Sequence, residues 1–234
     1  MMKRIISFLF MTILAYLTTM VSVSATELTQ YTATRVQRAY QLQQEDKLPE
    51  AIKILQKLEL KKHYDLAYVA RMLGVFYWQN NQPDNAIEQL NNAVEGGFLA
   101  DEQVWPTRRM LADILLSQEL FAKAIPHYYK LVHTLPDSEE GAVLWMRIAQ
   151  SHYQIAQWEK SLIALNNYEQ FNRPDAVPPL SLKLGAQLQL KQWENATSTL
   201  ERLLVLQPDK VNWWRQLVGI QLRLNQSRAA LNSL

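Results

Sequence analysis

A small residue recurs at nearly regular intervals along most of this chain. It is alanine five times and serine once, at successive spacings of 35, 38, 37, 35 and 34 residues: Ala51, Ala86, Ala124, Ser161, Ala196 and Ala230. Self-similarity at such a period is typical of repeat architectures. We therefore expect a stack of similar small units rather than a single layered domain.

The second unit shows what each copy contains. Gly74 and Tyr77 lie on one apolar segment, and Ala86 and Leu90 lie on the next. Pro83 opens the second segment, where its missing N–H costs nothing. Where two helices cross closely, one residue must be small, and a large side chain must fill the space beside it. The tract therefore predicts two helices that cross closely and are joined by a short turn.

The same alternation of small and large residues recurs in the other units. Its members are Ala39, Leu42 and Leu55 in unit one, Leu111, Ala112 and Tyr128 in unit three, Trp145, Ile148, Ala149 and Trp158 in unit four, Trp193, Leu200 and Leu203 in unit five, and Trp214 and Leu217 in unit six. This pattern resembles the tetratricopeptide-repeat family. The resemblance implies an all-α chain, a right-handed α-solenoid of about six helical hairpins. The units would occupy residues 32–64, 67–100, 105–138, 142–175, 178–209 and, incompletely, 211–234.

Four places depart from the pattern. Gly185 lies only eight residues before Trp193, whereas Ala149 lies nine before Trp158. Either one residue is missing from the fifth turn, or Leu184 takes the place of the small residue. Longer links at residues 96–97 and 171–179 should widen or tilt the stack locally. The sixth unit lacks a polar capping helix, so a longer parent chain, a partner or a second copy is expected to cover it.

The first 25 residues are predicted to be a cleavable secretory signal. Lys3 and Arg4 precede an apolar run, and the small residues Val23 and Ala25 favour cleavage before Thr26. The mature chain, residues 26–234, is then expected in the periplasm. The alternative is an uncleaved anchor in the inner membrane, because no charged residue occurs between Ile5 and Thr26.

Charge and cysteine content exclude several classes of function. Removing Lys3 and Arg4 lowers the 24 basic residues to 22, equal to the 22 acidic residues. A net charge near zero gives no electrostatic reason to expect nucleic-acid binding. The absence of cysteine excludes disulfides, lipid attachment through a thiol and thiolate metal sites.

No motif for catalysis, a cofactor or a metal ion is found. The four histidines, His63, His127, His133 and His152, include no pair four residues apart that would place two metal ligands on one helix face. His152 falls near a large aromatic position of the repeat and is expected to pack. A phosphate loop and a nucleophile elbow are also absent. We therefore expect a protein that is not an enzyme, without catalytic residues, cofactor or metal.

The family resemblance implies a concave groove lined by the first helix of each unit. The groove-facing positions map onto Tyr68, Arg71, Val75 and Trp78 in unit two, Arg109, Asp113 and Leu116 in unit three, Met146, Gln150 and Tyr153 in unit four, and Arg215, Gly219 and Leu222 in unit six. This mixed aromatic, aliphatic and arginine lining suits an extended peptide or a partner helix. The clamp by which some family members grip a terminal carboxylate is not visible, since Val36 and Tyr40 occupy two of its places.

Two groups of groove residues have alternative interpretations. Arg71, Arg109 and Arg215 share one repeat position and could form a ladder that receives carboxylates, or each could pair locally with an acid. Trp78, Trp105 and Trp158 could bind a partner, although most tryptophans are expected to pack in the core.

The sequence favours a scaffold or adaptor that binds proteins in a cell-envelope machine. Residues 208–217 resemble exported repeat proteins associated with Ton-type energy-transduction systems. One alternative is a helical regulatory part of a larger cell-wall or polysaccharide enzyme. Another is a structural protein that self-associates through its uncapped last unit.

Overall fold

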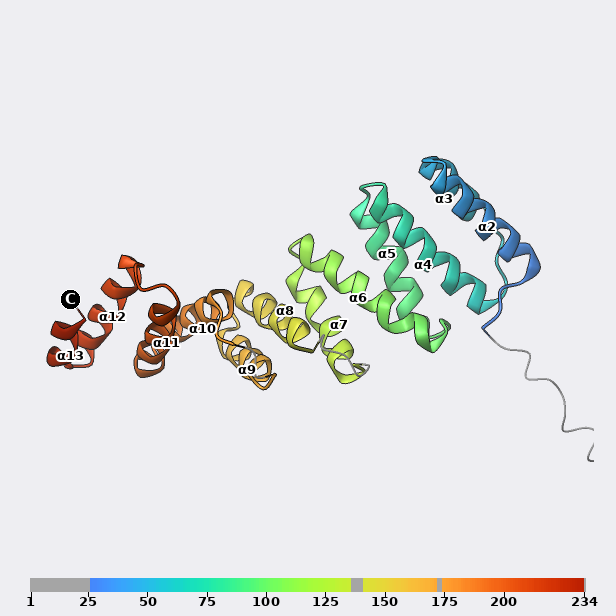
Figure 1. The fold of residues 1–234 in the computed structure, drawn as a ribbon. Coiled ribbons are helices and arrows are strands. Elements are labelled where there is room, and N and C mark those ends of the chain that lie inside the picture. Colours follow the sequence, from blue (N-terminus) through green and yellow to red (C-terminus); the bar gives the residue numbers. More distant parts are fainter. Residues whose placement is uncertain (1–25, 136–140, 172–173, 234) are drawn as a thin grey trace, which may run out of the picture.

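The computed structural model describes residues 26–135, 141–171 and 174–233, which form twelve helices and no strand. The hairpins are α2 (Gln30–Gln44) with α3 (Leu48–Gln56), α4 (His63–Gln79) with α5 (Pro83–Glu95), α6 (Asp101–Ser117) with α7 (Phe121–His133), α8 (Gly141–Gln154) with α9 (Trp158–Glu169), α10 (Val177–Gln189) with α11 (Trp193–Leu206), and α12 (Val211–Arg223) with α13 (Ser227–Asn232). They follow one another in an elongated stack (Figure 1). The prediction of an all-α chain of six hairpins is confirmed.

The recurring small residues lie where the two helices of each hairpin cross. Five of the six have no exposed surface, and Ala230 is 2% exposed. The Ser161 hydroxyl donates a hydrogen bond of 2.9 Å to the carbonyl of Ala149, twelve residues earlier on the partner helix. In unit two the position of Ala149 is occupied by Gly74, where an added Cβ would lie 2.5 Å from Cγ of Leu90. The small residues therefore mark the points of closest approach.

All six hairpin turns share one backbone conformation, which the sequence analysis did not predict. The residue five positions before each small residue has a positive φ, between 55° and 59°: Asp46, Asn81, Glu119, Ala156, Lys191 and Asn225. The next residue donates its N–H to a carbonyl near the end of the first helix, as from Gln82 to Tyr77 at 2.9 Å. This is the Schellman arrangement that satisfies terminal helix carbonyls. The identical turns give every hairpin the same register.

The uncertain phase of unit five is resolved by this turn. Lys191 lies five residues before Ala196, as in every other unit, so no residue is missing. Leu184 is buried at the position that the small residue occupies elsewhere. Gly185 instead makes room for Tyr153 of α8, whose hydroxyl would lie 2.5 Å from an added Cβ. The glycine therefore serves the contact between units rather than the crossing within its hairpin.

The longer links have different effects on the core. Leu99 and Ala100 are buried at the first link, and one core extends from Val36 to Leu165. A second core begins at Leu180. Charged groups bridge this junction: Arg202 Nε lies 2.9 Å from an Asp175 carboxylate oxygen, and Glu169 accepts from both Arg202 and Lys183. The apolar core is thus interrupted at the second link.

A buried carboxylate fixes the first unit to the second. Asp65, at the start of α4, is 2% exposed and accepts hydrogen bonds of 2.6 Å from the hydroxyls of Thr29 and Thr32. Burial raises the pKa of this carboxyl, but the threonine hydrogen bonds outweigh it and hold the pKa below its usual value. Thr29 is also the N-cap of α2. The hydrogen bonds from Thr29 and Thr32 to Asp65 therefore orient α2 against α4.

In the part of the chain described by the structure, the helices are all too short or too polar to span a bilayer. The predicted signal segment, residues 1–25, lies outside the described residues.

The shared turn gives a stability prediction. A non-glycine residue with positive φ costs about 1–2 kcal/mol, and asparagine tolerates this conformation better than alanine. Ala156→Gly is therefore expected to raise the free energy of unfolding by about 1 kcal/mol in urea titrations. The matched change Asn81→Gly should have a smaller effect. A destabilised Ala156→Gly chain would show that this turn is not under strain.

Candidate functional site

The predicted groove residues of unit two lie on one face of α4. Tyr68, Arg71 and Val75 are half-buried, and Trp78 is 39% exposed. Their spacing of three, four and three residues follows the helical repeat. The face on the other side of α4 carries Leu66, Ala70, Leu73 and Tyr77. The predicted groove residues therefore lie on a different face of α4 from Leu66, Ala70, Leu73 and Tyr77.

A pocket of about 460 Å³ brings α4 and α6 together in the groove. Trp78 contributes from α4, and α6 contributes Trp105, Pro106, Arg109, Met110, Asp113 and Ile114. Three of the predicted groove residues, Trp78, Arg109 and Asp113, thus share one site. The sequence had named Trp105 as a possible binding aromatic without placing it among the groove positions, and it missed Met110; the spacing of residues 105, 109 and 113 already places them on one helical face.

Asp113 is held in place from two sides. One carboxylate oxygen lies 2.8 Å from Nε of Arg109, and the other accepts a 2.6 Å hydrogen bond from the hydroxyl of Tyr128. Tyr128, on α7, is fully buried. Its burial and the Asp113 carboxylate raise the pKa of its phenol above the usual value. The charged end of the pocket is therefore rigidly positioned and anchored to the core.

The three arginines of the predicted ladder have different surroundings. Arg71 Nε donates 3.0 Å to the hydroxyl of Thr107, which ties α4 to α6, whereas Arg109 pairs with an acid on its own helix. Arg215 is exposed on α12. Met146 and Ser181 occupy the same repeat position in units four and five, so Arg215 is separated from the other two. Carboxylate binding by these arginines stays a prediction.

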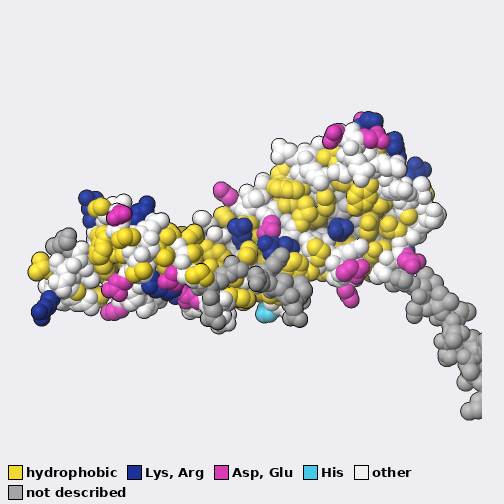
Figure 2. All heavy atoms as spheres, viewed as in Figure 1, with side chains coloured by type: hydrophobic (Ala, Val, Ile, Leu, Met, Phe, Trp, Pro, Cys, Tyr) yellow, Lys and Arg dark blue, Asp and Glu magenta, His cyan; other side chains and the backbone are white. Residues whose placement is uncertain are grey.

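Aromatic residues extend the apolar lining toward unit one. Tyr40 packs edge-on against Phe76 with ring centroids 6.1 Å apart, and Tyr64 lies 5.9 Å from Tyr68. Burial raises the pKa of the Tyr68 phenol. Val36 is buried and belongs to the core. On the face shown in Figure 2, hydrophobic side chains gather over this N-terminal half of the stack.

The groove residues of unit four take part in packing. Met146 contacts the core, as does Leu116 of unit three, and Gln150 accepts a 3.4 Å hydrogen bond from Arg147. Tyr153 packs edge-on against Trp158 at 4.8 Å and lies against Gly185. Less of this unit's surface is therefore available to a partner than in units two and three.

The tryptophans and histidines that were considered for binding are mostly held by the fold. Trp105 is half-buried and donates 3.3 Å to the carbonyl of Leu131. His152 is buried between the Tyr129 hydroxyl at 3.0 Å and the Gln157 amide oxygen at 2.8 Å, and burial lowers its pKa. The described residues contain no group of three or more His, Cys, Asp or Glu side chains that could hold a metal ion.

Comparison with known proteins shows the fold. No sequence-family profile and no curated protein sequence matches the chain. A crystal structure of a tetratricopeptide repeat protein from Parabacteroides merdae matches with a TM-score of 0.54 and 11% identity, covering 88% of this chain and 78% of that one. YrrB, described as a TPR protein with an unusual peptide-binding site, gives 0.58 and 16%, covering 77% and 89%. MamA from strain AMB-1 gives 0.58 and 13%, covering 76% and 93%. The chain thus has the tetratricopeptide-repeat fold.

The contact between Tyr128 and Asp113 gives a further prediction. A hydrogen bond to a charged group contributes about 1.5–3 kcal/mol. Tyr128→Phe keeps the packed ring and removes this bond, so the free energy of unfolding should fall by about that amount in urea titrations. Tyr129→Phe is the matched control on the same helix, because its partner His152 carries a lowered pKa and is uncharged at neutral pH. Equal losses for the two variants would contradict a special role of Asp113.

Proposed function

We propose that this chain is a protein-binding scaffold that holds an extended segment of a partner along the first helices of units two and three. The pocket formed by Trp78 and α6 carries this proposal. It joins an exposed indole to a fixed arginine–aspartate pair. Tryptophan and arginine beside a rigid apolar wall are typical of the residues that dominate protein interfaces.

The surroundings of the pocket favour a polypeptide over a small charged ligand. Arg109 is already neutralised by Asp113, so no net charge is left to attract an anion. Tyr68, on the same face of α4 as Trp78, interacts with Tyr40 of α2, and the two rings offer further aromatic contacts beside the pocket. The comparison with YrrB supports this proposal, because that protein of the same fold is described as having a peptide-binding site.

The periplasm is the proposed location, and its support is the sequence of residues 1–25. A basic start, an apolar run and a small-residue cleavage site together favour export with removal of the segment. The chain recovered from a periplasmic fraction should have an intact mass that begins at Thr26. A full-length chain in the membrane fraction would favour the uncleaved anchor instead.

More specifically, we propose that the scaffold serves a Ton-type transport system. The support is that residues 208–217 resemble a segment of exported repeat proteins associated with such systems. There the Trp214 indole donates 2.7 Å to the carbonyl of Pro208 and closes the turn before α12. The identity of a partner cross-linked to the groove tests this proposal.

A photocrosslinker tests the groove directly. p-Benzoylphenylalanine placed at Trp78 or Leu116 in cells should give one discrete adduct, because the two residues occupy the same predicted groove position of their units. The same residue at Ile163, which is 57% exposed on the second helix α9, should give none. Trp78→Gln should weaken capture of that partner by about 2 kcal/mol, or roughly thirtyfold. Equal adducts from all three positions, or none, would contradict groove binding.

Self-association is a second candidate, favoured by exposed apolar side chains on α11 and on the last hairpin. Val205, Val211, Leu222 and Leu231 are between 55% and 83% exposed. Exposed apolar surface of this kind is typical of an interface. Sedimentation velocity over a range of concentrations separates the two candidates, since a monomer at every concentration would remove this one.

A further inference from the structure

The second helix of unit one is short and leaves part of α4 uncovered. α3 has 9 residues, whereas α5 has 13. In unit two the last turn of α5 contributes Ala93 and Val94 to the core. In unit one the chain leaves the helix after Gln56 and crosses to α4 without helical structure. Leu66 of α4 is consequently 47% exposed.

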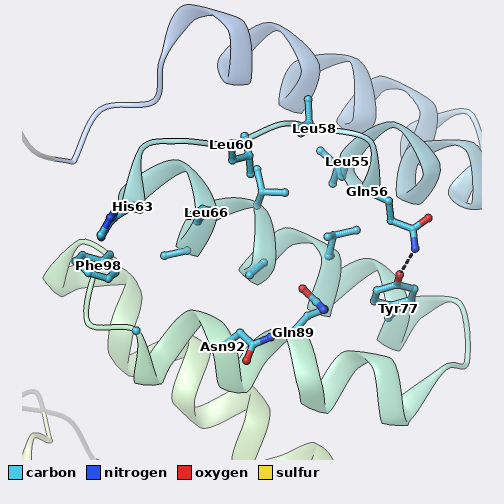
Figure 3. A pocket seen from close by; sticks show the side chains of 15 residues that line it. Leu55, Gln56, Leu58, Leu60, His63, Leu66, Tyr77, Gln89, Asn92 and Phe98 are labelled. Carbon is cyan, nitrogen blue, oxygen red and sulfur yellow. Dashed lines mark hydrogen bonds between the residues drawn. The ribbon is translucent and has the colours of Figure 1, made fainter.

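The uncovered region is a cleft of about 630 Å³ between α3 and α5 (Figure 3). Leu55, Leu58 and Leu60 lie along one wall, and Gln89 and Asn92 of α5 line the opposite wall. At one end the rings of His63 and Phe98 meet edge-on at 4.4 Å. At the other end Gln56 donates 2.6 Å to the Tyr77 hydroxyl. The cleft is therefore elongated, with a closed end on each side.

This cleft is separate from the groove proposed above. Its floor is the face of α4 that carries Leu66, Ala70 and Leu73, whereas the groove uses the other face, with Tyr68 and Arg71. At 3.6 residues per turn the two sets point in opposite directions. No residue lines both surfaces. A ligand in the cleft would leave the groove open.

The cleft contains no charged side chain. Asp, Glu, Lys and Arg make up 20% of the chain, yet none of the 15 residues that line the cleft is one of them. A second pocket, beside α10, differs in this respect, because Glu169, Asp175 and Arg202 line it. A charged ligand buried among leucines would lack a partner, and burying an unpaired charge is costly. The occupant is therefore uncharged and largely apolar.

The amide side chains of Gln89 and Asn92 on α5 indicate which class of uncharged ligand the cleft binds. Within the described residues, the half-buried side chain of Gln89 and the exposed side chain of Asn92 have no hydrogen-bond partner in the protein. Each amide both donates and accepts, and their helix positions are separated by a rise of about 4.5 Å. Covering them with hydrocarbon would cost about 1–3 kcal/mol each. A helix would not pair with them either, since its backbone groups are satisfied internally. An extended backbone offers donors and acceptors along its length.

We propose that the cleft between α3 and α5 binds an extended, uncharged peptide segment. Side chains at alternate positions, of leucine size, enter the floor formed by Leu66, Ala70 and Leu73. The backbone between them pairs with the amides of Gln89 and Asn92. In an extended chain alternate side chains lie about 7 Å apart on the same side, which suits an elongated cleft. This makes the protein a two-sided scaffold with independent sites on the two faces of unit two.

The test uses a fluorescent peptide, acetyl-Ser-Leu-Ser-Leu-Ser-Gly-amide, and its anisotropy with the mature chain. We expect binding with a Kd of about 1 mM or lower, and none for the peptide in which both leucines are replaced by asparagine. Gln89→Leu with Asn92→Leu should weaken binding at least about tenfold, the loss expected for two hydrogen bonds. Ala70→Phe, which fills the floor, should abolish it.

Matched controls decide between the proposal and its rivals. Asn91→Leu changes the neighbouring exposed amide that does not line the cleft, and Trp78→Gln changes the groove; neither should alter the affinity. The proposal is overturned if Ala70→Phe binds the peptide normally, or if the amide variants bind it as well as the unchanged protein. Displacement of the peptide by decanol, with tighter decanol binding after Gln89→Leu, would instead identify a hydrocarbon site. Loss of binding in Trp78→Gln alone would assign the peptide to the groove.

Discussion

In each hairpin the two helices cross closely, and the other features of the fold follow from this crossing. A small residue on the second helix, such as Ser161, meets a small residue twelve positions earlier on the first helix, such as Ala149. The near contact leaves holes that leucine and tyrosine fill, and it aligns the first helices on one side of the stack. That alignment places Trp78 beside α6. The binding surface is thus a consequence of the packing rule.

This constraint explains which parts of the fold could be predicted from sequence. Spacing alone located all six crossings, because close packing leaves a visible alternation of small and large residues. It did not reveal the positive φ of Glu119, Ala156 or Lys191, since no glycine marks those turns. The place of Leu184 was also ambiguous, because two adjacent residues satisfied the pattern. Turn geometry, which the sequence does not encode in a single residue type, decided between them.

The candidate site was predicted less completely, for a related reason. Repeat positions identify which face a residue lies on, and Trp78, Arg109 and Asp113 do share a pocket. Such a mapping does not identify partners on other helices. The hydrogen bonds from Tyr128 to Asp113 and from Arg71 to Thr107 were therefore found only in the structure. The cleft beside α3 was missed because it arises from a helix that stops early. Local deviations from a repeat, rather than the repeat itself, create this second surface.

The close crossing itself is tested most directly by two glycine-to-alanine changes in helix interiors, measured by urea unfolding. Alanine favours a helix over glycine by about 1 kcal/mol, so Gly219→Ala, which meets nothing within 4 Å, should raise the free energy of unfolding by about that amount. Gly74→Ala would place its Cβ 2.5 Å from Leu90 Cγ and 3.2 Å from the backbone nitrogen of Leu90, and should lower it by about 1–3 kcal/mol. Stabilisation by both changes would contradict close crossing as the basis of the fold.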